Sequence, residues 1–105
     1  MKPDRFDDAA LAEYAAAVRW YFERDPAAAH RFREHILGTV AAICESPALS
    51  PPVRGVAERL GVRKRVVARF PYSIVYVELE TEILILAVAH SRRRPTYWRK
   101  RLPPE

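Results

Sequence analysis

Two groups of cationic and aromatic side chains could do chemistry in this sequence. The first group follows His90: three arginines occupy positions 92–94, and Tyr97 and Trp98 lie a few residues further on. Guanidinium groups bind phosphates and carboxylates and stabilise charge that develops in a transition state, while His and Tyr side chains can transfer protons. The group therefore suits either a basic binding surface or a phosphate-cleaving site.

The second group lies in the segment 62–70, where basic and apolar residues alternate. Such alternation predicts a strand with one face toward a core and the other lined by arginines. We expect the core face to hold Val62, Val66, Ala68 and Phe70, and the opposite face to hold Arg63, Arg65, Val67 and Arg69.

Each of these residues also has a structural interpretation. His90 can be a hydrogen-bonded residue at the end of a strand instead of a general base. Tyr97 and Trp98 can clamp the C-terminal tail onto a sheet instead of stacking on bases. The three arginines can form a binding patch, or they can form ion pairs with Glu78, Glu80 and Glu82.

Charge is distributed unevenly along the chain. The net charge is +5, but residues 1–53 carry 6 basic and 8 acidic side chains, whereas residues 54–105 carry 12 basic and 5 acidic ones. The second half therefore has a net charge of +7. This asymmetry indicates an anionic partner, either nucleic acid or an acidic protein segment.

Composition excludes several other classes of protein. A chain of 105 residues, half of them apolar, is expected to form one domain over residues 1–105. No apolar run is long enough to span a bilayer, and the N-terminus lacks a signal-peptide core, so we expect a soluble cytoplasmic protein with no membrane contact. Cys44 is the single cysteine and is expected to be a reduced core thiol. His30 and His35 are poorly spaced for a shared ligand, so we expect no metal and no cofactor.

The elements that must position the cationic residues are a β-hairpin and two helices. Residues 72–79 and 83–90 are rich in Ile, Val, Leu and Tyr, and three residues separate them, which predicts two antiparallel strands. Both faces of the segment 83–89 are apolar. We expect helices to cover one face, and either a partner or the C-terminal tail to cover the other.

The helices are predicted from capping residues and apolar periodicity. Asp7 or Asp8 can cap a first helix that ends near Glu23, and Asp25 can cap a second helix that begins at Pro26 and ends near residue 45. We expect the apolar stripes to include Leu11, Tyr14, Val18 and Tyr21 or Phe22, and then Phe32, Ile36, Val40 and Ile43. The two helices should form an antiparallel hairpin on the sheet. Prolines exclude regular structure over 46–53, one helical turn is expected near 56–60, and the basic tail after Trp98 should be mobile.

Several of these motifs together resemble the ParE/RelE superfamily of bacterial toxins, most closely its ParE-like branch. The resemblance rests on Trp20-Tyr21, Phe32, Arg69-Phe70-Pro71-Tyr72, Ile74-Val75-Tyr76, Ala87-Val88-Ala89-His90, Arg92-Arg93 and Pro95-Thr96-Tyr97-Trp98. It implies an α+β fold, with an N-terminal antiparallel helical hairpin packed on a small antiparallel β-sheet. These folds begin with a strand before the first helix, and here only Lys2–Phe6 is available, so that strand is short or missing.

The resemblance also implies a function. The chain would be the toxin of a bacterial type II toxin-antitoxin system, neutralised by a ParD-like antitoxin whose C-terminal segment wraps across it. ParE-like members are regarded as poisons of DNA gyrase, which is a binding function, whereas RelE-like members cleave mRNA on the ribosome. A third possibility is an inactive toxin-like domain that only binds an antitoxin.

Two sets of residues correspond to these activities. A binding surface would use Arg63, Arg65, Arg69, His90, Arg92, Arg93, Tyr97 and Trp98. A nuclease site would use Lys64, Arg65, His90, Arg94 and Tyr97. Ser73 stands where the nuclease pattern has an arginine, and the loss of a central cation weakens a phosphate-cleaving site. The sequence therefore favours gyrase poisoning over mRNA cleavage.

Overall fold

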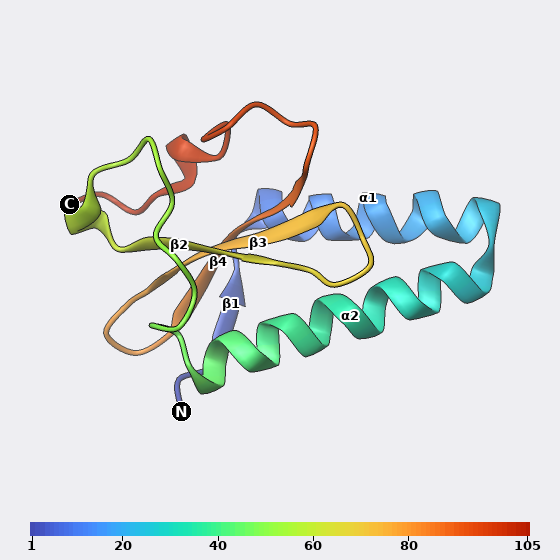
Figure 1. The fold of residues 1–105 in the computed structure, drawn as a ribbon, viewed down its shortest axis with the longest axis horizontal. Helices are drawn as coiled ribbons and strands as arrows, with labels where there is room; N and C mark the ends of the chain where they lie inside the picture. The colour runs from blue at the N-terminus through green and yellow to red at the C-terminus, as the bar shows by residue number, and fades with distance from the viewer.

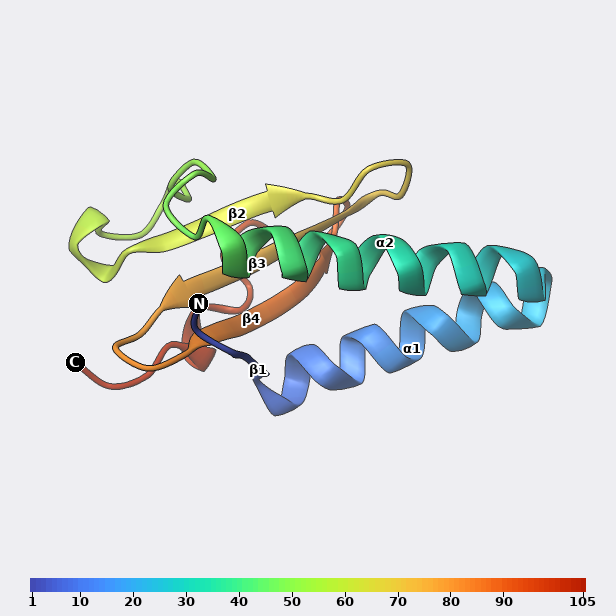
Figure 2. The ribbon, with the colours of Figure 1, turned by 90° about the horizontal axis from the view of Figure 1, so that it is seen from below.

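Two long helices follow a short first strand and lie side by side on one face of a sheet (Figures 1 and 2). The structure is a computed structural model that describes residues 1–105. Helix α1 spans Asp8–Arg24 and helix α2 spans Pro26–Glu45. The Asp7 and Asp25 carboxylates accept hydrogen bonds from the backbone amides of Ala9 and Ala27, the second residue of each helix, at 2.9 and 3.1 Å. These caps confirm the predicted helical hairpin.

Four strands form the sheet, in the order β1-β4-β3-β2. They are β1 (Asp4–Phe6), β2 (Val62–Val66), β3 (Tyr72–Glu78) and β4 (Ile83–His90). Strands β2, β3 and β4 are antiparallel, while β1 pairs in parallel with β4. The predicted α+β fold is confirmed. The short first strand exists, and it makes the sheet mixed instead of antiparallel throughout.

Strand β2 is shorter than the alternating pattern predicts, and the expected core position of Val66 is wrong. Val66 is 70% exposed, whereas Val67 is 1% exposed. Arg63 pairs with Tyr76 and Arg65 pairs with Ile74, so the two arginines share the face that packs on the helices. After Val66 the chain turns, with Arg69 at a positive φ of 70°, and this turn replaces the expected continuation of the strand to residue 70.

Strand β4 is apolar on both faces because a buried cluster lies on each face of the sheet, and a register shift distributes its side chains between the two clusters. Val75 pairs with Ala87, but the next residue, Tyr76, pairs with Ile85, so Leu86 is an extra residue in β4. Leu86 and Ala87 both belong to a cluster on the face away from the helices, while Ile85 and Val88 belong to the helix-side core. A β-bulge lets adjacent side chains share a face, and here it thickens the second core.

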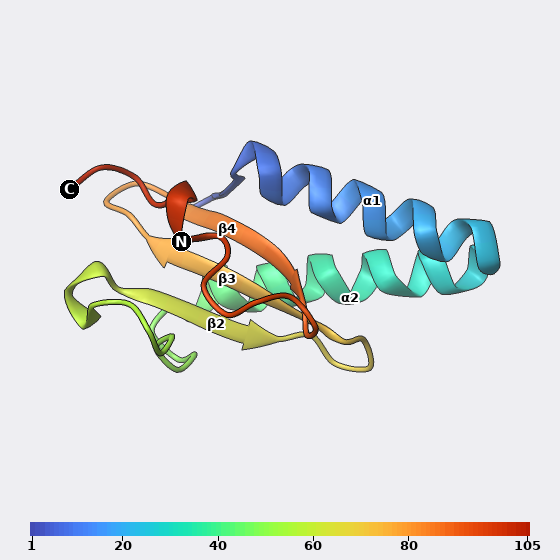
Figure 3. The same cartoon turned by 90° about the horizontal axis from the view of Figure 1, so that it is seen from above.

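The C-terminal tail covers this second face (Figure 3). Trp98 is 3% exposed and packs in the same cluster as Leu86 and Ala87. Its neighbours Arg99–Arg101, which were expected to lie in a mobile tail, form a 3₁₀ turn, η2. Of the two expected covers for the apolar face, the tail is therefore the one present.

The predicted apolar stripe of helix α1 is wrong at Leu11, which is 52% exposed. Tyr14 and Val18 pack against the helix-side core as predicted, and of the two alternatives at the end of the stripe Tyr21 packs there while Phe22 is exposed. Helix α1 needs only a narrow apolar stripe because it contacts β4 and α2 at one edge. The remaining short element is η1, a 3₁₀ turn at Glu58–Leu60. No helix combines the length and the apolar character required to cross a membrane.

Candidate functional site

Glu13 on α1 is the residue that holds the site together, although no sequence pattern singles it out. Its carboxylate accepts hydrogen bonds from the Val88 amide at 3.1 Å, from the Tyr97 hydroxyl at 2.6 Å and from both terminal nitrogens of Arg101 at 2.9 and 3.1 Å. Arg101 also donates to the Leu86 carbonyl at 3.0 Å. Strand β1 pairs only with the first residues of β4. Along the rest of that edge, the Val88 amide is hydrogen-bonded to Glu13 of α1, and the Leu86 carbonyl is hydrogen-bonded to Arg101 of the tail.

This network changes the acid-base properties of its members. Burial and the hydrogen bond to Glu13 raise the pKa of Tyr97 well above its ordinary value, and the same carboxylate raises the pKa of Arg101. Arg93 lies over the Tyr97 ring, with its guanidinium carbon 3.8 Å from the ring centroid. The Tyr97 phenol therefore keeps its proton and donates a hydrogen bond to Glu13, so it is a poor general base.

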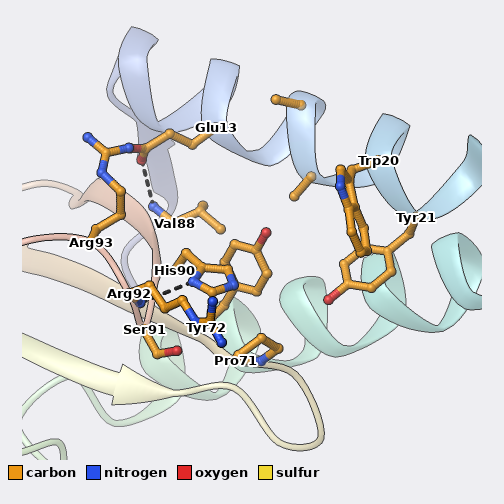
Figure 4. Close-up of a pocket in the computed structure, with 12 residues that line it drawn as sticks. Glu13, Trp20, Tyr21, Pro71, Tyr72, Val88, His90, Ser91, Arg92 and Arg93 are labelled. Carbon is orange, nitrogen blue, oxygen red and sulfur yellow. Dashed lines mark hydrogen bonds and ion pairs between the residues drawn. The ribbon is translucent and has the colours of Figure 1, made fainter.

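A groove lies between α1 and the ends of β3 and β4, and we call it the aromatic groove (Figure 4). Its volume is about 840 Å³. The residues that line it are Glu13, Ala16, Ala17, Trp20, Tyr21, Pro71, Tyr72, Val88, His90, Ser91, Arg92 and Arg93. Its walls therefore combine aromatic rings with two exposed arginines.

The rings on the strand side of the groove are held in place by specific contacts. His90 meets Tyr72 edge to face, with centroids 5.0 Å apart, and its Nδ1 atom accepts the Arg92 amide at 3.1 Å. This bond leaves Nε2 as the atom of the imidazole that can meet a ligand. Burial raises the pKa of the Tyr72 hydroxyl, which therefore stays protonated. The strand side offers fixed donors at neutral pH.

The helix side of the groove is a half-exposed aromatic wall. Trp20 is 50% exposed and meets Tyr21 edge to face, with centroids 5.1 Å apart. The guanidinium carbon of Arg24 lies over the Trp20 ring, 3.7 Å from its centroid. Large exposed aromatic surface of this kind is typical of interaction sites.

A second concavity lies on the tail side of His90, and we call it the basic hollow. Its volume is about 440 Å³, and it shares His90, Ser91 and Arg93 with the aromatic groove. Its other lining residues are Pro51, Pro52, Val53, Arg54, Lys64, Ser73, Val75, Ala89, Arg94, Pro95, Thr96, Tyr97 and Trp98. No carboxylate lines it.

The structure brings together some of the residues selected from the sequence and separates others. Of the nuclease set, the basic hollow contains Lys64, His90, Arg94 and Tyr97, while Arg65 lies on the opposite face of the sheet. Of the binding set, the aromatic groove contains His90, Arg92 and Arg93. Arg63 donates to the Ser50 carbonyl, Arg69 is in the turn after β2, and Tyr97 and Trp98 anchor the tail.

The alternative ion pairs between the arginines 92–94 and the hairpin glutamates are wrong. Glu78 pairs with Lys2 at 2.8 Å, and Glu82 pairs with Arg5 at 2.7 Å. Both glutamates lie near the N-terminus because β1 and the β3–β4 turn are adjacent. Of the three arginines only Arg93 has a carboxylate within salt-bridge distance, which is Glu13 at 3.9 Å. Arg92 and Arg94 therefore remain available to a partner, while Arg93 contacts Glu13 and the Tyr97 ring.

His30, His35 and Cys44 make contacts that indicate structural roles. His30 pairs with Glu34 one turn further along α2, and His35 packs against Phe70. Cys44 is buried and free, and burial raises the pKa of its thiol. No three His, Cys, Asp or Glu side chains converge where they could hold a metal ion.

Comparisons with known proteins agree with the resemblance. The family described as ParE toxin of type II toxin-antitoxin system, parDE, matches residues 5–95. A solved structure described as the chromosomal ParDE toxin-antitoxin system from P. aeruginosa superposes with a TM-score of 0.71 at 21% identity. The match covers 86% of this chain and 96% of that chain. No curated protein matches the sequence. Since the family match spans most of the chain, this protein belongs to the ParE toxin family of type II toxin-antitoxin systems.

Proposed function

We propose that this toxin inhibits bacterial growth by poisoning DNA gyrase and that a ParD-like antitoxin neutralises it. The observation that carries the proposal is the aromatic groove with Arg92 and Arg93 exposed at its rim. Aromatic and arginine side chains supply most of the energy of protein interfaces. The proposal treats residues 1–105 as one toxin domain that acts in the cytoplasm, where gyrase is found.

The aromatic groove is the proposed site for the C-terminal segment of the antitoxin. The apolar face of β4, which the sequence offered as an alternative docking surface, is covered by Trp98 and the rest of the tail. An acidic segment with apolar side chains would place the apolar groups against Trp20 and Tyr21 and its carboxylates near Arg92 and Arg93. Such a segment would order on binding.

Gyrase is favoured over mRNA because the nuclease set is incomplete in space. Arg65 lies on the helix side of the sheet, Ser73 occupies the expected arginine position, and the Tyr97 hydroxyl donates to Glu13. The second candidate is a ribosome-dependent mRNA endonuclease, and the observation in its favour is that Lys64, His90 and Arg94 line one hollow. An inactive toxin-like binding domain is the third.

The first prediction compares the purified wild-type protein with two charge-matched variants. Arg92→Ala/Arg93→Ala should reduce inhibition of gyrase supercoiling by about tenfold or more, because two rim cations of an interface are lost. Arg19→Ala/Arg33→Ala removes the same charge from exposed helix positions and should inhibit like the wild type. Supercoiling of relaxed plasmid, titrated with each toxin, is the measurement.

A second part of the same experiment tests whether the toxin cleaves mRNA. Translated mRNA is incubated with ribosomes and each toxin, and cleavage products are mapped by primer extension. If the toxin poisons gyrase, the mRNA should stay intact. The protein would belong to the nuclease branch if the mRNA were cleaved at defined codon positions and gyrase supercoiling were unchanged. In that case His90→Ala should abolish cleavage and still bind the ribosome. A toxin without effect in either arm would be an inactive binding domain.

A further inference from the structure

We propose that Arg69, in the turn between β2 and β3, binds a carboxylate of the antitoxin's acidic segment, and that the chain keeps an arginine on strained backbone for this contact. The inference rests on the proposed function, because it adds a residue to the aromatic groove as the antitoxin site. It gives a ligand group and a position in the site to a residue that the sequence placed only in a general binding surface.

The backbone of Arg69 suits glycine better than arginine. Its φ is 70°, in the left-handed region, where the Cβ atom of an ordinary residue crowds the backbone. Gly61 has almost the same φ, 68°, and nothing lies within 4 Å of the place where its Cβ atom would be. The chain therefore uses glycine at one such position and arginine at the other. Backbone geometry alone favours glycine at both.

The turn itself does not use the Arg69 side chain. Two backbone hydrogen bonds close the turn, from the Val67 amide to the Tyr72 carbonyl at 2.9 Å and from the Tyr72 amide to the Phe70 carbonyl at 2.8 Å. Arg69 is exposed, and its guanidinium makes no ion pair, hydrogen bond or cation–π contact within the chain. Strain that no internal contact offsets is concentrated at residues that act on a ligand.

The turn borders the aromatic groove. Pro71 lines the groove (Figure 4), and the Phe70 ring meets Tyr21, another lining residue, edge to face with centroids 5.3 Å apart. The Ser91 amide donates to the Pro71 carbonyl at 2.8 Å, which fixes the turn beside the segment that follows β4. Arg69 is thus carried by a turn whose next two residues are both built into the groove.

The charges at this end of the groove favour a carboxylate as the ligand. Arg92 follows Ser91 directly, lines the groove and is exposed, and like Arg69 it has no carboxylate within salt-bridge distance. Guanidinium groups bind carboxylates in a planar, two-bond geometry. A segment with apolar side chains against Trp20 and Tyr21 would therefore place an acidic residue within reach of Arg69 and Arg92.

The test moves the guanidinium without changing the composition of the chain. Wild type, Arg69→Gly and the exchange variant Arg69→Gly/Gly61→Arg are purified, and the exchange variant keeps the net charge and the number of glycines. Calorimetry gives the Kd of each toxin for the small acidic protein encoded by the neighbouring reading frame, and for the same protein without its C-terminal segment. Melting curves of all three toxins are recorded, and each toxin is titrated against supercoiling by gyrase.

We expect Arg69→Gly to weaken binding of the full antitoxin by about tenfold, since a hydrogen-bonded charge pair is lost. The exchange variant should show the same loss, because its arginine lies away from the groove. Both variants should bind the truncated antitoxin like the wild type. The melting temperature of Arg69→Gly should equal or exceed that of the wild type, because the strain is relieved.

Full binding by Arg69→Gly, or full binding restored in the exchange variant, would overturn the proposal. A lower melting temperature of Arg69→Gly would show that the side chain serves the fold, which would overturn it as well. Weaker inhibition of gyrase with unchanged antitoxin affinity would assign Arg69 to gyrase instead. If the wild type bound the full and the truncated antitoxin equally well, the groove would fail as the antitoxin site. If truncation mattered and Arg69→Gly did not, only the present inference would fail.

Discussion

At the scale of single residues, one carboxylate decides how the C-terminal half of the molecule is arranged. Glu13 is 16% exposed at its side chain and joins α1 to β4 and to the tail. A buried carboxylate is stable only when its oxygens are hydrogen-bonded, and here three residues provide the donors. Because Glu13 also lies at the edge of the aromatic groove, it links the packing of the tail to the shape of the site.

The pKa of Tyr97 makes a prediction about stability and pH. The pKa is raised in the folded state and is ordinary, about 10, in the unfolded state. The contribution of Tyr97 is therefore complete below about pH 10 and decreases as the pH rises through the folded-state pKa. Tyr97→Phe should lower the free energy of unfolding by about 1.5–3 kcal/mol at pH 8, because a hydrogen bond to a charged group is lost.

Urea unfolding at pH 8 and pH 11 is the measurement for Tyr97. The difference between wild type and Tyr97→Phe should shrink at pH 11, and taking the difference removes the contributions of the other tyrosines. A difference of the same size at both pH values would contradict the assigned contact with Glu13.

At the scale of elements, the bulge in β4 and the tail form one unit. The bulge directs Leu86 and Ala87 to the face away from the helices, and it frees the Leu86 carbonyl for Arg101. Trp98 covers the apolar surface that results. A four-stranded sheet of this size thus has a core on each face, even though helices cover only one of them.

The two tryptophans provide a matched test of this unit. Trp98→Ala should lower the free energy of unfolding by about 3–5 kcal/mol, because it leaves a cavity in the second core. Trp20→Ala should cost only about 1 kcal/mol, since Trp20 is half exposed and its main contacts are with Arg24 and Tyr21. Thermal and urea unfolding of the two variants measure these differences. Similar losses in both variants would mean that the tail does not cover the sheet as described.

At the scale of the whole molecule, two concave surfaces meet at the end of β4. His90, Ser91 and Arg93 separate the aromatic groove from the basic hollow, so ligands in the two sites would lie next to each other. Five cations of the second half of the sequence line these surfaces, namely Arg54, Lys64, Arg92, Arg93 and Arg94. Glu78 and Glu82 of the hairpin form their ion pairs at the opposite end of the sheet. The charge asymmetry of the sequence thus becomes an asymmetry between the two ends of the molecule.

This arrangement predicts how an antitoxin would bind. The product of a neighbouring reading frame that encodes a small acidic protein should bind tightly, and removal of its C-terminal segment should weaken binding by about a hundredfold or more, since the segment fills the aromatic groove. Binding of the full antitoxin should shift the fluorescence of half-exposed Trp20 to the blue, and the shift should be absent in Trp20→Phe. Calorimetry measures the affinities. A truncated antitoxin that binds as tightly as the full one would contradict the assignment of the groove.

The sequence by itself determined the elements and the family. Capping residues such as Asp7 and Asp25, the proline at the start of α2 and the apolar runs of β3 and β4 act within a few residues of the chain, so their effects can be read locally. The order of the motifs from Phe70 to Trp98 was enough to indicate ParE-like toxins, and the family match agrees with it.

Only the tertiary structure determined which residues come together in the candidate sites. Glu13 and Arg101 are 88 residues apart, and no periodicity links them. The faces of Arg65 and Val66 depend on how β2 pairs with β3, and the turn at Arg69 ends the alternation that the sequence pattern predicts up to residue 70. Most of all, the bulge at Leu86 shifts every later side chain of β4, and only the pairing with β3 reveals it. Sites formed by contacts between distant segments depend on register and packing, which a local pattern does not encode.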